Sequence, residues 1–527
     1  MLLSDCRREE KERMGNKSAN SRLSWQLRVF FAIMLLVAAC IALTLGTDKD
    51  TADVETIVTA TPPAGPATEL RIAQVFAPNS LDPTFLSGRD TAFAIYNIFD
   101  RLYAQDHTLQ FVPSLAIYHE YPDEITWRFH LRRGVKFHNG NDFKANDVKF
   151  TIDRYQEANE STRLGTTSAI EDVRIVDDYT VDIILKYPYA AFLTQSSLME
   201  MLDEEYYLEV GDEGLAARPV GTGPYKFVEW DQEQGLVLEI NEGYWGRVPR
   251  QIKTLMFVPI SEADDRTSAL ERDKVDIIAS VPCEYEAKPG IRLEELIGTR
   301  AYYVGLNVDM EPFDDREVRQ AMNFAVDVDA IIETVLNGRA RKLDGPLYPE
   351  TFGYTEIGYY SYDPGKARRL LAGAGYPDGF EVTLDYYAGF EEVAEILQAQ
   401  YEEVGIQVNL NLMDKGDCYD KYEPGDSQMF LTSWGNREAD ASPLFRRQFH
   451  SDRVKAYTNY SNPEFDALVN KADATQHARN RQGIHAEALE IVIKDAPWVY
   501  LYNASGLCGV ADSVKKWQAR QYCPNDQ

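Results

Sequence analysis

The residues of this sequence that could do covalent or metal chemistry are spaced in ways that match no common catalytic site. The sequence contains no G-x-S-x-G nucleophile elbow, no H-E-x-x-H zinc helix and no phosphate-binding P-loop. "GTGPY" at residues 221–225 lacks the third glycine of a nucleotide fingerprint, so a tight turn is expected there. None of the seven histidines lies four residues from another, which argues against a preformed metal site. We therefore expect a protein that is not an enzyme and needs no cofactor or metal.

Length and charge restrict the class further. A chain of 527 residues has room for two or three domains, and its 44% hydrophobic and 26% charged content is that of a globular protein. The formal net charge of −30 argues against nucleic acid as a partner, because phosphates require a basic surface. The 12% aromatic content, with 31 tyrosines, fits either rings that grip a ligand or a richly packed core.

The N-terminal segment is the part of the sequence that does not read as globular. "VFFAIMLLVAACIALTL" at residues 29–45 carries no charge, a basic stretch precedes it, and an acidic stretch rich in Thr, Ala and Pro follows it. This charge asymmetry predicts a cytoplasmic segment at residues 1–24, a membrane anchor or signal segment at 25–45 and a flexible tether at 46–68. The bulk of the chain is then expected outside the cytoplasm.

Two fates are open for that apolar segment. It can stay as an uncleaved anchor, which the apolar "IALTL" after Cys40 favours. Alternatively, "VAAC" resembles a bacterial lipobox, in which Cys40 would become the lipidated first residue. Met14 is a second possible start of the chain.

Four cysteines follow the tether, where an oxidising compartment allows disulfides. They are Cys283, Cys418, Cys508 and Cys523, and no C-x-x-C motif occurs among them. Four cysteines allow three pairings. We expect Cys508 to pair with Cys523 and Cys283 to pair with Cys418, with buried free thiols as the alternative.

Apolar periodicity indicates a mixed α/β chain. Strand, helix and strand follow one another in "IKTLMFVPI", "SEADDRTSALERDKV" and "VDIIAS", and again in "FEVTLDYY", "FEEVAEILQAQYEEVG" and "IQVNLNLM". Two α/β units are therefore expected. Between residues 125 and 140, "ITWRFHLRRGVKFHNG" alternates like a hairpin with its turn near Gly134.

A series of motifs occurs in a fixed order from about residue 69 to about residue 520. They are "NSLDPTF", "NIFDRLY", "FVPSLA", "WRFHLRRGVKFHNGNDFKANDVKFTIDR", "GTGPYKFVEW", "NEGYWG", "PFDDREVRQAMNFAVD", "YDPGKARRLLAGAGYPDGF", "VGIQVNL", "YSNPEFDALVNKA" and "DAPWVYLY". Each motif is weak alone, but the ordered set is specific. The chain resembles the extracellular solute-binding proteins of peptide and nickel ABC importers, of the oligopeptide- and dipeptide-binding type.

This resemblance implies a fold and its boundaries. We expect a two-lobed, hinged periplasmic-binding-protein-like α/β fold with a cleft between the lobes. The first lobe would span residues 69–300 with an extra subdomain at about 98–215, the second lobe 301–495, and residues 496–527 would return to the first lobe. The helix in "PFDDREVRQAMNFAVD" would begin the second lobe, with Asp314 or Asp315 as its cap. Its packing residues would be Val318, Met322, Phe324 and Ala325.

The resemblance also points to a segment that would read the solute. Peptide-binding relatives carry a Trp, an Asp that pairs with the peptide ammonium, and a second Asp. In "SWGNREADASPLF", Trp434 and Asp440 match the first and last positions, whereas Arg437 stands where the ammonium-binding Asp is expected. Three interpretations are open: Asp440 or Glu438 binds an ammonium, Arg437 binds a carboxylate or phosphate, or Arg437 pairs with a neighbouring acid.

Further candidate residues for solute contact come from the first lobe. "PNSLDP" and "LSGRD" stand where its ligand-facing loop is expected, which adds Asn79, Ser80 and Arg89.

Taken together, the resemblance implies a monomeric receptor that does no chemistry. It would capture oligopeptides or a related organic solute outside the bacterial cytoplasmic membrane, in the periplasm or at the cell surface, and deliver it to ABC permease subunits. One alternative is a carrier of a nickel or other metal chelate, for which His450 lies near the Trp434 segment but is expected at the surface. Another alternative is a sensor that presents its ligand without transport.

Overall fold

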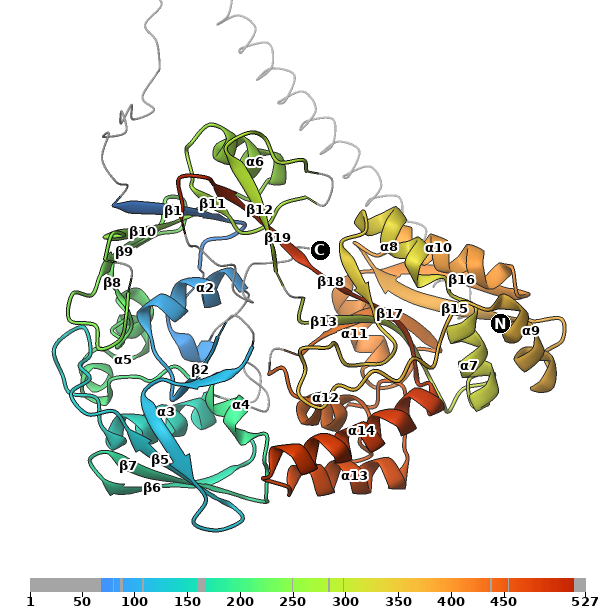
Figure 1. Ribbon diagram of the computed structural model, residues 1–527, viewed down its shortest axis with the longest axis horizontal. Coiled ribbons are helices and arrows are strands. Elements are labelled where there is room, and N and C mark those ends of the chain that lie inside the picture. Colours follow the sequence, from blue (N-terminus) through green and yellow to red (C-terminus); the bar gives the residue numbers. More distant parts are fainter. Residues whose placement is uncertain are drawn as a thin grey trace, which may run out of the picture. The chain divides into compact units, whose positions relative to one another are not determined.

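The computed structural model describes residues 68–515, apart from 79, 86–88, 107–108, 159–166, 249, 283–284, 297, 437 and 454. In α2, the side chains of Arg89 and Asp90 are also outside the description. Most described strands belong to three sheets, each with its own hydrophobic core, and Figure 1 follows them along the chain.

The first of these is a mixed seven-stranded sheet. Its strands, in spatial order, are β12 (Ile291–Leu296), β19 (Gly506–Ala511), β11 (Ile277–Ile278), β1 (Glu69–Gln74), β10 (Thr254–Pro259), β9 (Gly235–Ile240) and β8 (Tyr225–Asp231). β1 pairs in parallel with β10 and β11, and the other pairs are antiparallel. The associated helices are η1 (Pro83–Phe85), α2 (Arg89–Ile98), α5 (Glu204–Ala217) and α6 (Ala263–Glu271). The predicted strand, helix and strand of residues 252–280 appear here as β10, α6 and β11.

An antiparallel four-stranded sheet forms a separate subdomain within this part of the chain. Its strands are β4 (Ala116–Glu120), β5 (Thr126–Leu131), β7 (Thr180–Leu185) and β6 (Ile170–Asp177). It packs with α3 (Ala145–Glu157) and α4 (Phe192–Ser196) around buried side chains such as Trp127, Phe129 and Phe192. β2 (Tyr103–Gln105) and β3 (Phe111–Pro113) form a small antiparallel pair. The seven-stranded sheet and this subdomain are called the first lobe below.

A mixed six-stranded sheet forms the second lobe. Its strands are β14 (Ala340–Lys342), β18 (Trp498–Ala504), β13 (Arg300–Leu306), β17 (Met429–Gly435), β15 (Phe380–Tyr387) and β16 (Ile406–Met413). Its helices are α7 (Arg316–Phe324), α8 (Val328–Leu336), α9 (Pro364–Gly373), α10 (Glu391–Glu402), α11 (Lys415–Tyr422), α12 (Ala441–Gln448), α13 (Pro463–Asp473) and α14 (Ala478–Asp495). β15 and β16 pair in parallel and α10 connects them, which confirms the predicted α/β unit.

Two chain crossings join the lobes. The chain passes from β12 in the first lobe to β13 in the second, and it returns from β18 to β19. The two crossings lie side by side, because β12 pairs with β19 and β13 pairs with β18, both antiparallel (Figure 1). The lobe boundaries drawn from the sequence stay predictions, and they lie beside these crossings.

The helix predicted at the start of the second lobe is α7. Asp315 is its N-cap, and the Asp315 carboxylate accepts the backbone N–H of Glu317 at 2.7 Å. The predicted packing residues are all buried: Val318, Met322, Phe324 and Ala325. Cap and stripe are both local in sequence, so this part of the prediction is confirmed.

The hairpin predicted at residues 125–140 is wrong. Only its first half is a strand, β5, and β5 pairs with β4 and β7 rather than with residues that follow Gly134. Beyond β5 the chain makes turns, with an isolated bridge between Lys136 and Asp142. Alternation predicts a strand but does not choose its partner, which the packing of the whole subdomain decides.

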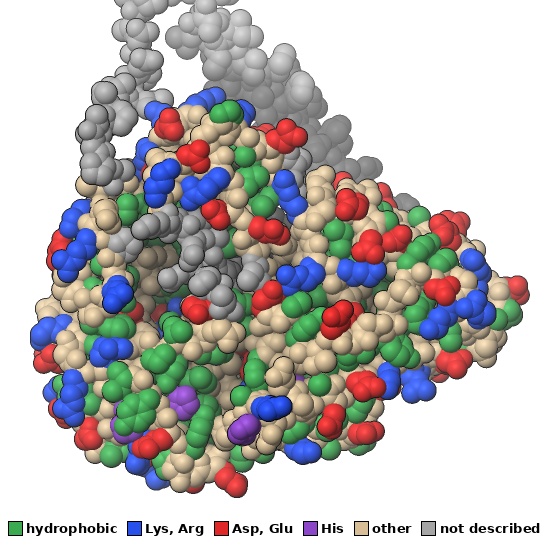
Figure 2. Space-filling model, in the orientation of Figure 1, with side chains coloured by type: hydrophobic (Ala, Val, Ile, Leu, Met, Phe, Trp, Pro, Cys, Tyr) green, Lys and Arg blue, Asp and Glu red, His purple; other side chains and the backbone are tan. Residues whose placement is uncertain are grey.

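Acidic and basic side chains are interspersed over the face of the molecule in Figure 2. That face therefore carries no continuous basic stripe of the kind that binds nucleic acid. Among the residues that the structure describes, no helix combines the length and the apolarity needed to cross a membrane. The predicted anchor at residues 25–45 and Cys40 lie outside those residues.

Candidate functional site

The segment that the sequence singles out connects β17 to α12. Trp434 lies near the end of β17 and is half-buried, opposite Ala301 of β13. Asp440 is the N-cap of α12, and its carboxylate accepts the backbone N–H of Ser442 at 3.0 Å. A polar loop is thus held between a central strand and a capped helix, both of which are rigid.

The loop is tied directly to a crossing between the lobes. The Asn436 backbone N–H donates to the carbonyl of Thr299, at 2.8 Å, just before β13. The Tyr348 hydroxyl donates to the Asn436 carbonyl at 2.6 Å, and Asn436 Nδ2 donates to the Asp440 carbonyl at 3.0 Å. Because Thr299 lies in the crossing, the position of this loop is coupled to the hinge.

Asp440 is already engaged by the protein. Arg481 of α14 donates from one guanidinium nitrogen to Asp440 Oδ1 at 2.5 Å and to Ser442 Oγ at 2.9 Å. The Arg481 guanidinium also lies 4.8 Å from the centre of the Phe352 ring. Arg481 and Asp440 are both buried, so removing either charge would leave the other unpaired in a water-poor environment.

Glu438 is a second buried acid in the same loop. Its side chain is 8% exposed, and Glu438 Oε1 accepts from Arg447 at 3.1 Å, whereas the Arg447 side chain is 33% exposed. The cation of this pair is therefore much better hydrated than its anion. Such a pair is easier to rearrange than the buried pair of Asp440 and Arg481.

Tyrosines of the first-lobe subdomain lie close to these charges. Tyr189 is buried, and burial raises the pKa of its phenol, with the carboxylates of Asp473, Asp440 and Glu438 adding to the rise. Burial raises the pKa of Tyr121 to about 12, while the Arg481 guanidinium acts in the opposite direction. Both phenols therefore stay neutral near pH 7, and the Tyr121 hydroxyl lies 3.0 Å from His119 Nε2, within its own subdomain.

Comparison with known proteins identifies the family of the chain. The family described as "Bacterial extracellular solute-binding proteins, family 5 Middle" matches residues 110–456. The chain belongs to this family. It is therefore an extracytoplasmic solute-binding protein, and the expectation that it is not an enzyme is confirmed by the family.

Individual relatives agree with the family. A glutathione-binding protein of Pectobacterium atrosepticum is 30% identical over 444 residues, which cover 80% of this chain and 86% of the relative. Heme-binding protein A of Haemophilus influenzae is 31% identical over 445 residues, covering 76% and 81%. The structure of the periplasmic binding protein DppA of Helicobacter pylori with the peptide STSA is 27% identical, with a TM-score of 0.70, covering 85% and 95%. The predicted periplasmic-binding-protein fold is confirmed.

The other predicted solute contacts of this family 5 protein are only partly described. Ser80 is half-buried, and its Oγ accepts the backbone N–H of Asp82 at 3.1 Å, within the first lobe. Arg89 begins α2, but its side chain, Asn79 and Arg437 lie outside the described residues. Trp434 and Asp440 flank the same loop of the second lobe, whereas Ser80 lies in the first lobe. The roles of all six residues in solute binding stay predictions.

Arg481 was missed from the sequence, although a signal for it exists. The buried residues of α14 recur at helical spacing, and Arg481 and His485 lie in that stripe with Ile484, Ala488 and Leu489. A positively charged side chain on the buried face of a helix needs a buried acidic partner. For Arg481 that partner is Asp440.

The predicted pairing of Cys283 with Cys418 is wrong. Cys418 is a free thiol in α11, buried in the core of the second lobe, where burial raises its pKa to about 11. Cys508 is disulfide-bonded, and its partner lies outside the described residues. The pairing of Cys508 with Cys523 stays a prediction.

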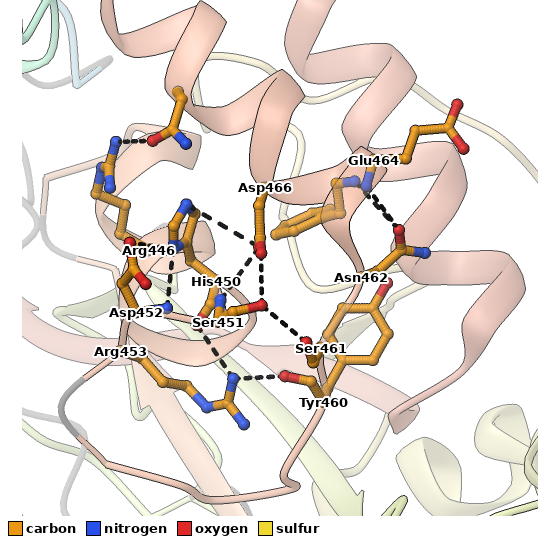
Figure 3. Close-up of polar contacts among 12 residues, drawn as sticks. Arg446, His450, Ser451, Asp452, Arg453, Tyr460, Ser461, Asn462, Glu464 and Asp466 are labelled. Atoms are coloured by element: carbon orange, nitrogen blue, oxygen red, sulfur yellow. Dashed lines mark hydrogen bonds and ion pairs between the residues drawn. The ribbon is translucent and has the colours of Figure 1, made fainter.

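The expectation that His450 lies at the surface is also wrong. Its side chain is 3% exposed, and its Nδ1 accepts the backbone N–H of Asp452 at 3.1 Å. Its Nε2 lies 4.0 Å from Asp466 of α13, and Asp466 also accepts the backbone N–H of Ser451 (Figure 3). This network ties the loop after α12 to α13, which buries the ring. The described part of residues 68–515 holds no group of three or more His, Cys, Asp or Glu placed for a metal ion.

Proposed function

We propose that this chain is the substrate-binding component of an ABC importer. It captures oligopeptides or a related organic solute outside the cytoplasmic membrane and delivers the solute to the permease subunits. One observation carries this proposal: the similarity to the STSA-bound DppA of Helicobacter pylori extends over 85% of this chain and 95% of the relative. A likeness of that extent includes both lobes and both crossings, which a trap for a solute needs.

Within this function, Glu438 is our candidate for the group that binds a peptide ammonium. Asp440 is occupied by Arg481 and by its role as the cap of α12. Glu438 lies two residues away, is buried, and pairs with an arginine that is one-third exposed. A buried carboxylate is stabilised strongly by a cation at hydrogen-bonding distance. The ammonium of a peptide can therefore displace Arg447 from the Glu438 carboxylate, or bind that carboxylate together with Arg447.

The first test measures binding by the full chain. Thermal unfolding is followed with the tetrapeptide Ser-Thr-Ser-Ala, with glutathione and with heme, and native mass spectrometry looks for a solute that copurifies. A solute present at 100 times its Kd should stabilise the fold by about 2.7 kcal/mol through mass action. If no peptide or other organic solute raises the Tm, the proposal fails.

The second test addresses Glu438. The substitution Glu438→Gln should weaken binding of the free tetrapeptide by about 10- to 150-fold, the equivalent of one charged hydrogen bond. Binding of the N-acetylated tetrapeptide, which has no ammonium, should not change. Equal losses for both peptides would assign Glu438 to the scaffold of the loop.

The alternative solute is a nickel or other metal chelate, and metal analysis of the same purified protein tests it. A metal that copurifies in stoichiometric amount, without any organic peptide, would favour that alternative. The sensor alternative differs only in the partner, so pull-down of the full chain with permease subunits distinguishes the two.

We propose further that the N-terminal segment at residues 25–45 keeps the protein at the membrane. The intact mass of the protein extracted from membranes distinguishes the two forms of attachment. A lipid-anchored protein should begin at Cys40 and carry acyl chains, whereas a protein held by an uncleaved helix should keep the residues before Cys40.

A further inference from the structure

The segment at residues 187–191, between β7 and α4 of the first-lobe subdomain, contacts the second lobe. The backbone N–H of Ala190 donates to the carbonyl of Asp473, at the end of α13, at 2.7 Å. The Arg446 guanidinium of α12 lies over the Tyr187 ring, 5.8 Å from its centre. These contacts join residues 283 and 259 positions apart in the sequence, outside the two crossings.

Arg446 of α12, with Asn470 and Asp473 of α13, forms a cradle for this segment on the second lobe. Arg446 Nε donates to the Asp473 carboxylate, whose side chain is 1% exposed, and a second guanidinium nitrogen donates to Asn470 Oδ1 at 2.7 Å. Arg446 is therefore held by two side chains of α13 in addition to its contact with Tyr187. The fixed guanidinium and the end of α13 form one docking surface.

The segment brings two tyrosine rings to this contact. Tyr187 is 40% exposed, whereas Tyr189 is 3% exposed, and the two rings lie 6.1 Å apart in an edge-on arrangement. Tyr189 is neutral and lies near the charges of Asp473, Asp440 and Arg447. One backbone bond, one cation–π contact and one buried ring thus act together over a few residues.

We propose that residues 187–191 are a latch that holds the first-lobe subdomain against α12 and α13 and so sets how often the two lobes are closed. Its partners are groups of the protein, so it acts on closure rather than on the solute. The consequence for solute capture rests on the proposed function, because closure matters there only if the lobes close on a solute. The latch raises the apparent affinity for every solute by the same factor.

The test reads the latch without any solute, by hydrogen exchange of the full chain followed by mass spectrometry. Tyr187→Ala removes the ring in the first lobe, and Arg446→Lys removes the planar guanidinium in the second lobe while keeping a cation for Asp473. Each variant should speed exchange in peptides covering residues 187–192 by about two- to fivefold, the range for a solvent-accessible cation–π contact. If Tyr187 acted only within its own lobe, Arg446→Lys in the second lobe would not change exchange at residues 187–192. Faster exchange there in Arg446→Lys therefore supports a contact between the lobes.

Tyr179→Ala is the matched control. Tyr179 also lies under an arginine, with the Arg133 guanidinium 4.5 Å from its ring centre, but both residues belong to the same subdomain. This control should leave exchange at residues 187–192 unchanged. Unchanged exchange in both latch variants, or equal acceleration in the control, would overturn the proposal.

A second readout uses two defined probes, the tetrapeptide Ser-Thr-Ser-Ala and glutathione. Tyr187→Ala should weaken binding of both by one common factor of about two to five, since only the closed population changes. Different factors for the two probes would mean that Tyr187 touches the solute, which overturns the latch. If neither probe binds, the proposed function loses support, while the exchange experiment still decides the latch.

Discussion

At the scale of single residues, the buried pair of Asp440 and Arg481 decides what the loop after β17 can do. Asp440 caps α12 and neutralises Arg481, which in turn contacts Ser442 and Phe352. A residue that the sequence motif presents as a solute contact therefore carries much of the local scaffold. Glu438 of the same loop pairs instead with Arg447, whose side chain is one-third exposed.

Breaking this pair from one side should be costly. Arg481→Met leaves the Asp440 carboxylate buried without its cation, and the free energy of unfolding should fall by about 3–5 kcal/mol, measured by urea denaturation. Asp440→Asn keeps an effective helix cap, so the double variant Arg481→Met with Asp440→Asn should recover a large part of the loss. Losses that simply add in the double variant would show that the two side chains are not coupled.

His485 predicts a pH dependence of stability. Burial and the nearby Arg481 lower its pKa from 6.5 to about 4, although Asp440 acts in the opposite direction. Between these pH values the unfolded chain binds a proton at His485 that the folded protein does not, so stability is lost as the pH falls from about 6.5 to 4. The stability advantage of the wild type over His485→Gln should shrink by up to about 3 kcal/mol over that range.

The comparison with His485→Gln removes the contribution of other titrating groups. Urea denaturation at several pH values between 7 and 4 provides the measurement. A difference between the two proteins that is constant with pH would contradict the lowered pKa of His485.

At the scale of elements, local signals predicted helices better than strand partners. The cap and the buried stripe of α7 were predicted because both lie within a few turns of one helix. β5 was predicted as half of a hairpin, but it lies between β4 and β7, and β7 begins almost 50 residues after β5 ends. Backbone pairing in a sheet is not local, so alternation alone cannot choose the neighbour.

Two adjacent aspartates test the assignment of the α7 cap. Asp315→Ala removes the carboxylate that accepts the Glu317 N–H and should lower the free energy of unfolding by about 0.5–2 kcal/mol. Asp314→Ala is the control, because the exposed Asp314 is not the N-cap, and it should change stability by less than about 0.5 kcal/mol. Chemical denaturation of the two variants in parallel tests the assignment. Equal decreases in the free energy of unfolding would refute it.

At the scale of the whole described molecule, the backbones of the two crossings lie in close contact near Gly298 and Ala504. A Cβ on Gly298 would lie 2.0 Å from the carbonyl oxygen of Ala504, in the opposite crossing. Asn503 Nδ2 also donates to the Arg300 carbonyl at 2.8 Å, so the crossings are bonded as well as packed. The hinge is therefore a pair of strands in contact rather than two independent linkers.

Adding one methyl group at this position should separate the crossings. Gly298→Ala should lower the free energy of unfolding by about 1–3 kcal/mol, the range for overpacking against fixed neighbours. Gly416→Ala in α11 is the matched control, since a Cβ there meets no atom within 4 Å, and it should be neutral or stabilising by up to about 1 kcal/mol. Thermal unfolding of both variants checks the prediction, and equal effects would mean that the crossings can move apart without cost.

Sequence patterns alone predicted the class of protein: an α/β chain in two units, with a capped helix opening the second. The role of the Trp434–Asp440 segment in solute binding stays a prediction. Those features depend on periodicity, capping and ordered motifs, which are local along the chain. The sequence patterns did not show that Arg481 pairs with Asp440, that His450 and Cys418 are buried, or that residues 187–191 contact α12 and α13; the folded structure shows all of these. Each of these is a contact between distant parts of the chain, and burial sets the energies of such contacts only after the chain has folded.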